Sequence, residues 1–196
     1  MNNDRNWIIV RIDGKIAAIS TDYKLLSSIT ARLAKDVKTR YSEITAKTAS
    51  FDEVWQLKET TRWEDMMIFG TDFQKKVWTK LYGMIHSEID GSRIPKLISY
   101  SDFAEMCQNR AGVRAVAHAI SLNPVSVIIP CHLVVPKEAI DRMMMINKKA
   151  EATIFKGNDL CLSSILKNEA IDFGNYAMGP GLKRELIALE LTGTDL

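Results

Sequence analysis

The residues with the clearest capacity for chemistry are Cys131 and His132, which are neighbours at the end of an apolar run over 125–130 that is expected to be a strand. The nucleophile in cysteine chemistry is the thiolate, and a free thiol with a pKa of about 8.5 is mostly protonated at neutral pH. A neighbouring histidine is a candidate base for the thiol proton. The same pair is also typical of a small buried cysteine beside a hydrogen-bonded histidine, because free cysteine is among the most buried residue types. The pair therefore indicates a candidate nucleophile that needs support from the elements around it.

The other cysteines and histidines indicate structural roles. Cys107 and Cys161 have no adjacent base, and His86 and His118 are scattered along the chain. An odd and sparse set of 3 cysteines neither builds a disulfide framework nor has the paired spacing of a zinc site. We therefore expect reduced thiols, no metal and no cofactor.

Size and composition are those of an ordinary soluble globular protein. The chain has 196 residues, of which 46% are apolar and 26% charged, enough for a sizeable core in one domain or two small ones. A formal charge of only +2 gives no global basic field, so any contact with DNA must come from a local patch. The beginning of the sequence has no apolar signal segment, and no run approaches the roughly 18 apolar residues of a membrane span. These features predict a cytoplasmic protein that does not associate with a membrane.

The first half of the chain predicts a small α+β domain. Residues 7–20 form two β-rich runs separated by an Asp-Gly pair, which is a strong signal for a hairpin. Residues 23 to about 37 repeat apolar side chains at helical spacing and predict a helix that packs on the hairpin. The polar stretch that follows has a helix-compatible composition only around 51–57, and a linker is expected near 66–70.

Three helices are predicted in the second half. Thr71 and the next residue can cap a helix whose apolar stripe runs from Phe73 to Ile85. Ser99 can cap a short second helix, and a third is expected from about 113 to 121 after a turn that contains glycine. Two short helices joined in this way form a helix-turn-helix, whose second helix can enter a DNA groove. Most such pairs are plain packing units, so the spacing alone leaves DNA binding open.

Five ordered blocks of sequence resemble the O6-alkylguanine-DNA alkyltransferase family, also called methylated-DNA-protein-cysteine methyltransferases. The opening helix, the two helices of the recognition motif, the active-site motif and the closing loop with its helix correspond to TDFQKKVWTKL, SYSDFA, GVRAVAHAISLNP, IPCHLVV and GNYAMGPGLKRELIALE. The separation of Arg114 from Cys131 also fits the family. The resemblance implies an α+β fold in which a small N-terminal β-sheet with a helix, over 1–68, precedes a mostly helical domain over 69–196. That second domain would be winged-helix-turn-helix-like and would hold the DNA-binding and active-site residues.

The resemblance implies a single-turnover DNA repair protein. Cys131 would accept an alkyl group, methyl included, directly and irreversibly from guanine O6. His132 would take the thiol proton through a water molecule, and Glu190 would orient the histidine and balance its charge. Asn123 would brace the turn before the active-site strand. Tyr100 would help to rotate the nucleotide and would donate its hydroxyl to the guanine ring; an aromatic side chain half in the core is the alternative.

The implied partner is double-stranded DNA that contains alkylated guanine. The O6 position inside a duplex is out of reach of a thiol in a protein pocket, so the base must be flipped out at a cost of a few kcal/mol. Arg114 aligns with the family arginine that fills the vacated stack, and Arg110 is a candidate phosphate contact. Ala115 and Ala119 would keep one helix face thin enough for the groove, although small residues equally permit close packing inside a protein. A protein that acts once has no evident need of a second copy, so a monomer is expected.

Three departures from the family pattern indicate an altered pocket. Leu133 replaces the usual arginine, which removes a charge and several donors. An insert at about 136–173 is long enough to carry its own strand and helix, and loops of this length are usually functional or disordered. Ala177 and Met178 stand where some members offer a hydroxyl and a glycine to the flipped base. The substrate pocket would still be formed by Val134, Tyr176 and Ala177.

Two alternative functions stay open. The first is a non-enzymatic protein that recognises alkylated bases with the same fold and needs no acceptor thiol; the retained Cys131 argues against it. The second is a helix-turn-helix DNA-binding regulator with no damage chemistry, which specific binding to an undamaged sequence would favour.

Overall fold

The computed structural model describes residues 5–21, 23, 26–27, 43–86, 97–151 and 158–193. The chain divides into two compact units. The N-terminal unit consists of residues 2–86 and 118–131, and the C-terminal unit of residues 87–117 and 132–196. The predicted domains 1–68 and 69–196 are each continuous in sequence, whereas each compact unit combines separate segments. The domain boundary after residue 68 therefore stays a prediction.

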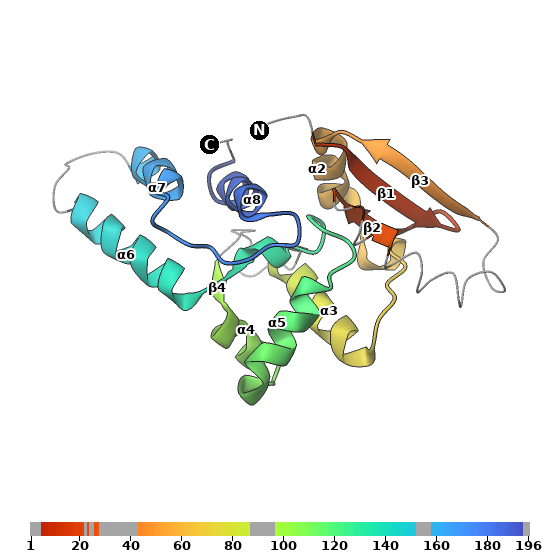
Figure 1. The fold of residues 1–196 in the computed structure, drawn as a ribbon, viewed down its shortest axis with the longest axis horizontal. Helices are drawn as coiled ribbons and strands as arrows, with labels where there is room; N and C mark the ends of the chain where they lie inside the picture. Colours follow the sequence, from red (N-terminus) through yellow and green to blue (C-terminus); the bar gives the residue numbers. More distant parts are fainter. Residues whose placement is uncertain are drawn as a thin grey trace. The chain divides into compact units, whose positions relative to one another are not determined.

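The N-terminal unit begins with an antiparallel sheet in the order β2-β1-β3 (Figure 1). Its strands are β1 (Trp7–Ile12), β2 (Lys15–Ser20) and β3 (Ile44–Ala49). Asp13 and Gly14 have φ angles of 47° and 79°, the left-handed backbone that a two-residue hairpin turn requires. The predicted hairpin is therefore confirmed. The helix predicted over residues 23–37 lies almost entirely outside the described residues.

Helix α2 (Phe51–Thr60) starts at a reciprocal cap. The backbone amide of Glu53 donates to Ser50 Oγ at 3.2 Å, and the amide of Ser50 donates to Glu53 Oε2 at 2.8 Å. The two bonds satisfy amides that have no partner within the helix. The Ser50 amide, followed by Lys47, lowers the pKa of the Glu53 carboxyl. A carboxyl whose pKa is lowered on folding stabilises the fold above its unfolded pKa, so this contribution is lost as the pH falls into the acid range.

A Ser50→Ala variant should lower the free energy of unfolding by about 1 kcal/mol, because it removes the oxygen that caps α2. Urea denaturation at neutral pH measures the change. Ser50→Asp keeps an acceptor at the same position and should stay close to the native value. Equal losses in both variants would contradict the capping role.

The described part of the N-terminal unit also contains the short 3-10 helix η1 (Trp63–Asp65) and helix α3 (Asp72–His86). The predicted start of α3 is confirmed, since the Gln74 amide donates to Thr71 Oγ1 at 3.2 Å. The face predicted to be apolar is buried at Val77, Trp78, Leu81 and Ile85.

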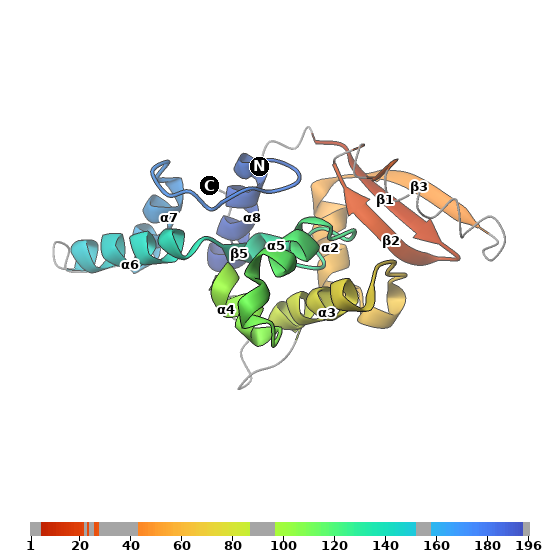
Figure 2. The ribbon, with the colours of Figure 1, turned by 60° about the horizontal axis from the view of Figure 1, so that its bottom comes forward.

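The C-terminal unit contains the predicted helix-turn-helix (Figure 2). Its elements are α4 (Tyr100–Met106), the turn η2 (Arg110–Gly112) and α5 (Val113–Ser121), the end of which belongs to the N-terminal unit. Ser99 caps α4 by accepting from the Asp102 amide at 3.1 Å. The described part of the unit also contains β4 (Ile98–Ser99), β5 (Val134–Val135), α6 (Lys137–Glu151), α7 (Asn158–Lys167) and α8 (Pro180–Thr192). The short 3-10 helix η3 (Cys131–Leu133) begins at the last residue of the N-terminal unit and continues into the C-terminal unit. Strands β4 and β5 pair in parallel.

The insert forms two helices, α6 and α7, and α7 packs against both α6 and α8 (Figure 1). The described residues of the insert, 137–151 and 158–173, contain no strand. A shared core joins the insert to α8 through Val135, Ala139, Ile165, Leu166, Ile171, Phe173, Ile187 and Ala188. The insert is therefore part of the C-terminal core.

The expectation of a strand over residues 125–130 is wrong, because this segment turns back on itself. The Ile129 amide donates to Val125 O at 3.0 Å, and Val127 between them has a φ of 75°. A left-handed φ is rare for a β-branched residue and breaks the extended backbone. Only the start of the segment pairs with β2, through a single parallel bridge in which the Ser126 amide donates to Ile19 O at 3.2 Å. The apolar composition favoured a strand here. It indicates only that the segment is buried, however, and a turn can be buried as well.

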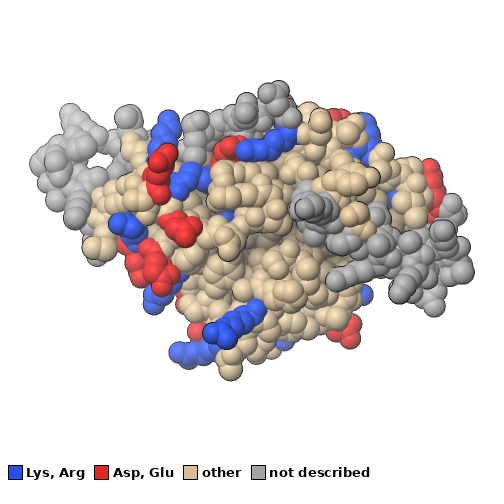
Figure 3. Space-filling model, viewed as in Figure 1, with Lys and Arg blue, Asp and Glu red and all other residues tan. Residues whose placement is uncertain are grey.

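The observed architecture is α+β, as predicted: a small antiparallel sheet in the N-terminal unit and a mostly helical C-terminal unit. None of the helices in the described part of the chain is both long and apolar enough to cross a membrane. On the face seen in Figure 3, acidic and basic side chains are interspersed among uncharged ones, in line with the small net charge.

Candidate active site

Asn123 organises the backbone that leads to Cys131. Its Nδ2 donates to Ile129 O at 2.8 Å and to Cys131 Sγ at 3.1 Å, and its Oδ1 accepts from the Val125 amide at 3.0 Å. Both Asn123 and Cys131 are buried. One side chain thus closes the turn after α5 and directs a donor at the sulfur. A donor at that position stabilises the negative charge of a thiolate.

His132 follows on the short turn η3 and lies 3.2 Å from Glu190, measured from Nε2 to Oε1. The two side chains are 0% and 2% exposed. Glu190 is on α8, near its C-terminal end. A buried carboxylate at this distance holds the imidazole ring in place and can stabilise it once it gains a proton. The structure thus brings together two residues that are far apart in the sequence and were both predicted to serve the site.

A residue that the sequence analysis missed is Lys183, which is 1% exposed. Its Nζ donates to Val134 O at 2.8 Å and lies 5.7 Å from the ring centre of Tyr100. Tyr100 is half-buried at the first position of α4. Lys183 therefore joins α8 to the strand that follows His132 and to the predicted nucleotide-rotating tyrosine. The sequence contained one signal for this role. Lys183 lies in the stripe of α8 that is otherwise apolar and that ends at a second charged residue, Glu190.

The predicted pocket residues occupy different environments. Val134 is fully buried in β5, whereas Tyr176 is half-buried and Ala177 exposed in the loop before α8. That loop starts at Gly174, which has a φ of 80°. A Cβ atom there would lie 3.1 Å from the ring of Pro136, so both the backbone angle and the space favour glycine.

The predicted DNA-binding residues divide between surface and interior. Arg110, Arg114 and Ala115 are exposed. Ala119 is only 2% exposed, and its carbonyl accepts from Trp78 Nε1 at 2.8 Å. Ala119 therefore packs inside the protein, on the side of α5 that faces away from solvent. Close packing was the alternative to contact with a DNA groove.

Leu133, the residue in place of the family arginine, is fully buried. An apolar side chain suits this position, because an arginine there would need partners for its five donors. Within the described residues, no group of three or more histidine, cysteine or acidic side chains is placed to hold a metal ion.

Removing the Asn123 side chain should affect stability and sulfur chemistry together. An Asn123→Ala variant leaves the buried Val125 amide and Ile129 carbonyl without these bonds, at a cost of about 2 kcal/mol or more. The labelling of Cys131 by iodoacetamide should also slow. Denaturant unfolding and peptide mass spectrometry measure the two effects. Asn168→Ala, which loses one exposed bond to the Ala170 amide, is the control and should change little.

The fold and this geometry define a class: helix-turn-helix proteins whose chain continues into a buried cysteine and a histidine bonded to a carboxylate. Residues 72–151 match the family model described as the DNA-binding domain of 6-O-methylguanine DNA methyltransferase. Over this segment the chain is similar to the O6-alkylguanine-DNA alkyltransferases.

Curated relatives show the same similarity over part of their length. A probable methylated-DNA-protein-cysteine methyltransferase of Acanthamoeba polyphaga mimivirus is 40% identical over 73 residues, 37% of this chain and 44% of that protein. An inducible enzyme of the same name from Bacillus subtilis is 40% identical over 68 residues, 35% of this chain and 34% of that protein. The matched segment thus spans less than half the length of each relative.

The fold is also that of a solved O6-methylguanine-DNA methyltransferase. The crystal structure of the protein from Pyrococcus kodakaraensis aligns with a TM-score of 0.54 and 20% identity. The alignment covers 97% of this chain and 95% of that one. The similarity in fold therefore includes the N-terminal half, which lies outside the segment 72–151 that matches the family model.

Proposed function

We propose that this protein repairs O6-alkylguanine in DNA by moving the alkyl group onto Cys131. The observation that carries the proposal is the environment of the Cys-His pair: Asn123 donates to the sulfur, and Glu190 lies within hydrogen-bonding distance of His132. These two contacts support the proposed roles of Cys131 as nucleophile, His132 as base and Glu190 as orienting group. Cys131 also lies inside the segment that matches the family model.

The proposed reaction is a direct displacement at the alkyl carbon. His132 takes the thiol proton, the sulfur forms a bond to carbon, and the bond from carbon to O6 breaks with its electron pair left on guanine. A proton from Tyr100 or from solvent then neutralises the guanine. The thioether is stable, so each molecule acts once, and no cofactor takes part.

The proposed substrate is double-stranded DNA. A flipped guanine would enter beside Val134, Tyr176 and Ala177, while Arg114 fills the vacated stack and Arg110 contacts a phosphate. Exposure of both arginines is compatible with these roles. We further propose that the protein acts in the cytoplasm as a monomer.

The test is incubation of the purified protein with a duplex that contains one O6-methylguanine. The peptide that bears Cys131 should gain the mass of one CH2 group, and the duplex should contain restored guanine in equal amount. An unmodified cysteine despite tight binding to the lesion would favour a protein that only recognises alkylated bases. Preference for an undamaged sequence, with no transfer, would favour a regulator.

A further inference from the structure

The end of α7 is held by an arginine from α8. Arg184 Nη1 donates to Leu166 O and, at 3.0 Å, to Asn168 O, while Nη2 donates to Ile171 O. Its guanidinium also lies 4.8 Å from the ring centre of Phe173. The last carbonyls of a helix have no partner within it, so one side chain satisfies acceptors at the end of α7 and in the segment that follows.

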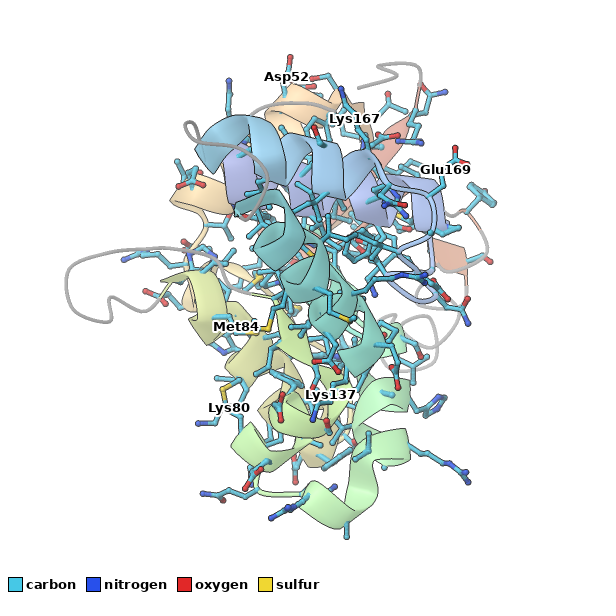
Figure 4. All side chains as sticks on the ribbon, turned by 90° about the vertical axis from the view of Figure 1, so that its left-hand side faces the viewer. Asp52, Lys80, Met84, Lys137, Lys167 and Glu169 are labelled. Atoms are coloured by element: carbon cyan, nitrogen blue, oxygen red, sulfur yellow. The ribbon has the colours of Figure 1, made fainter. Side chains whose placement is uncertain are left out.

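The planar shape of the guanidinium makes these contacts possible. A guanidinium presents five donors in a fixed fork, whereas an ammonium is a compact point charge on a flexible stem. Burial lowers the pKa of Arg184, and the carboxylates of Glu169 and Asp172 oppose that shift. Figure 4 shows Glu169 just beyond the end of α7. Because an arginine remains protonated in proteins, a charged group binds the segment.

A second arginine holds the same segment from the other helix of the insert. Arg142 Nη1, from α6, donates to Ala170 O at 2.9 Å. Its bond is exposed and single, whereas Arg184 makes three bonds that include partly buried ones. Arg184 is therefore the principal attachment, and Arg142 offers a matched comparison.

The segment held by Arg184 continues into the proposed pocket. Ile171 and Phe173 are buried, and the Gly174 amide donates to Asp172 Oδ1 at 2.8 Å. The next residues form the loop with Tyr176 and Ala177. Arg184 thus attaches the start of this loop to α8, the helix that also carries Glu190.

We propose that Arg184 is a positioning residue that uses the insert to fix the base pocket. It holds the segment 168–173 against α8 and so sets where Tyr176 and Ala177 meet a flipped guanine. The inference rests on the proposed alkyl transfer. It gives the insert a role in that reaction that the sequence analysis did not assign.

The test compares Arg184→Met, Arg184→Lys and Arg142→Met in the full chain. Arg184→Met should slow transfer from O6-methylguanine duplex by about 10- to 100-fold at saturating DNA, because small displacements of binding groups cost rates of that order. Arg184→Lys should recover little, since lysine cannot reproduce the fork. Arg142→Met should stay within about 3-fold of the native rate, because its single exposed bond contributes little.

Two further readouts separate positioning from general damage. Labelling of Cys131 by iodoacetamide, which needs no base pocket, should be unchanged in Arg184→Met. Amide hydrogen exchange over residues 171–179 should accelerate in that variant, while exchange in α3 stays native. Equal slowing of labelling and transfer, or full rescue by Arg184→Lys, would overturn the positioning role.

The outcomes also separate this inference from the proposed function. If the native protein transfers no alkyl group, the proposed function fails and with it a role of Arg184 in that reaction; hydrogen exchange still decides whether the attachment exists. If the native protein transfers and Arg184→Met is equally fast, only the inference is overturned.

Discussion

A Cys131→Ala variant is expected to transfer no alkyl group while it still binds DNA that contains O6-methylguanine. The sulfur is the only atom that forms the new bond in the proposed reaction, and a methyl side chain cannot replace it. The DNA-contacting side chains proposed on α5, by contrast, are unchanged. Mass spectrometry of the whole protein measures transfer, and a gel-shift assay with the same duplex measures binding.

The matched control is Cys107→Ala, because Cys107 is also buried, at the end of α4. This variant should gain the methyl group as fast as the native protein. A methyl group found on Cys107 or Cys161 in the Cys131→Ala protein would show that another thiol is the acceptor and would end the present proposal. Loss of both binding and transfer would indicate damage to the fold, which a thermal unfolding curve would reveal.

The elements that could be predicted from sequence are those whose ends are set by local chemistry. The hairpin turn at Asp13 and Gly14 and the caps at Thr71 and Ser99 each depend on residues within three positions of one another. Such signals are readable without tertiary structure. The same holds for the Cys-His pair, whose partners are adjacent.

The elements that escaped prediction depend on distant partners. Strand β3 is exposed along most of its length and mixes polar with small residues, so it has no apolar alternation; it is defined by pairing with β1. The turn around Val127 looks like a strand in composition and is closed by Asn123. Glu190 could be connected with His132 only through the family resemblance, because nothing local marks a pair 58 residues apart.

The insert illustrates a different limit. Its length left both a functional and a disordered loop open, and its proposed role becomes visible only when Arg184 and the shared core with α8 are seen together. A side chain that bonds three carbonyls has no sequence signature, since carbonyls belong to every residue. The candidate site could thus be proposed from sequence, but the elements that support it could not.

A Glu190→Gln variant is expected to slow alkyl transfer by about 100-fold or more, within the range that general acid-base groups contribute. Glutamine keeps the size and one oxygen of the side chain, so packing around His132 is largely conserved. It removes the negative charge that stabilises the imidazole after it accepts the thiol proton. Single-turnover rates with O6-methylguanine duplex measure the loss, and Glu185→Gln, on the same helix but half-exposed, should retain the native rate.

The pair with His132 permits a stricter test. If Glu190 acts through His132, replacement of both residues in a His132→Gln, Glu190→Gln protein should be about as slow as His132→Gln alone, because residues that work as a unit are not additive. Two independent losses that multiply would mean that Glu190 contributes by another route. The short distance between Nε2 and Oε1 in a fully buried site favours the coupled result, since charge stabilisation between these atoms is screened little by solvent.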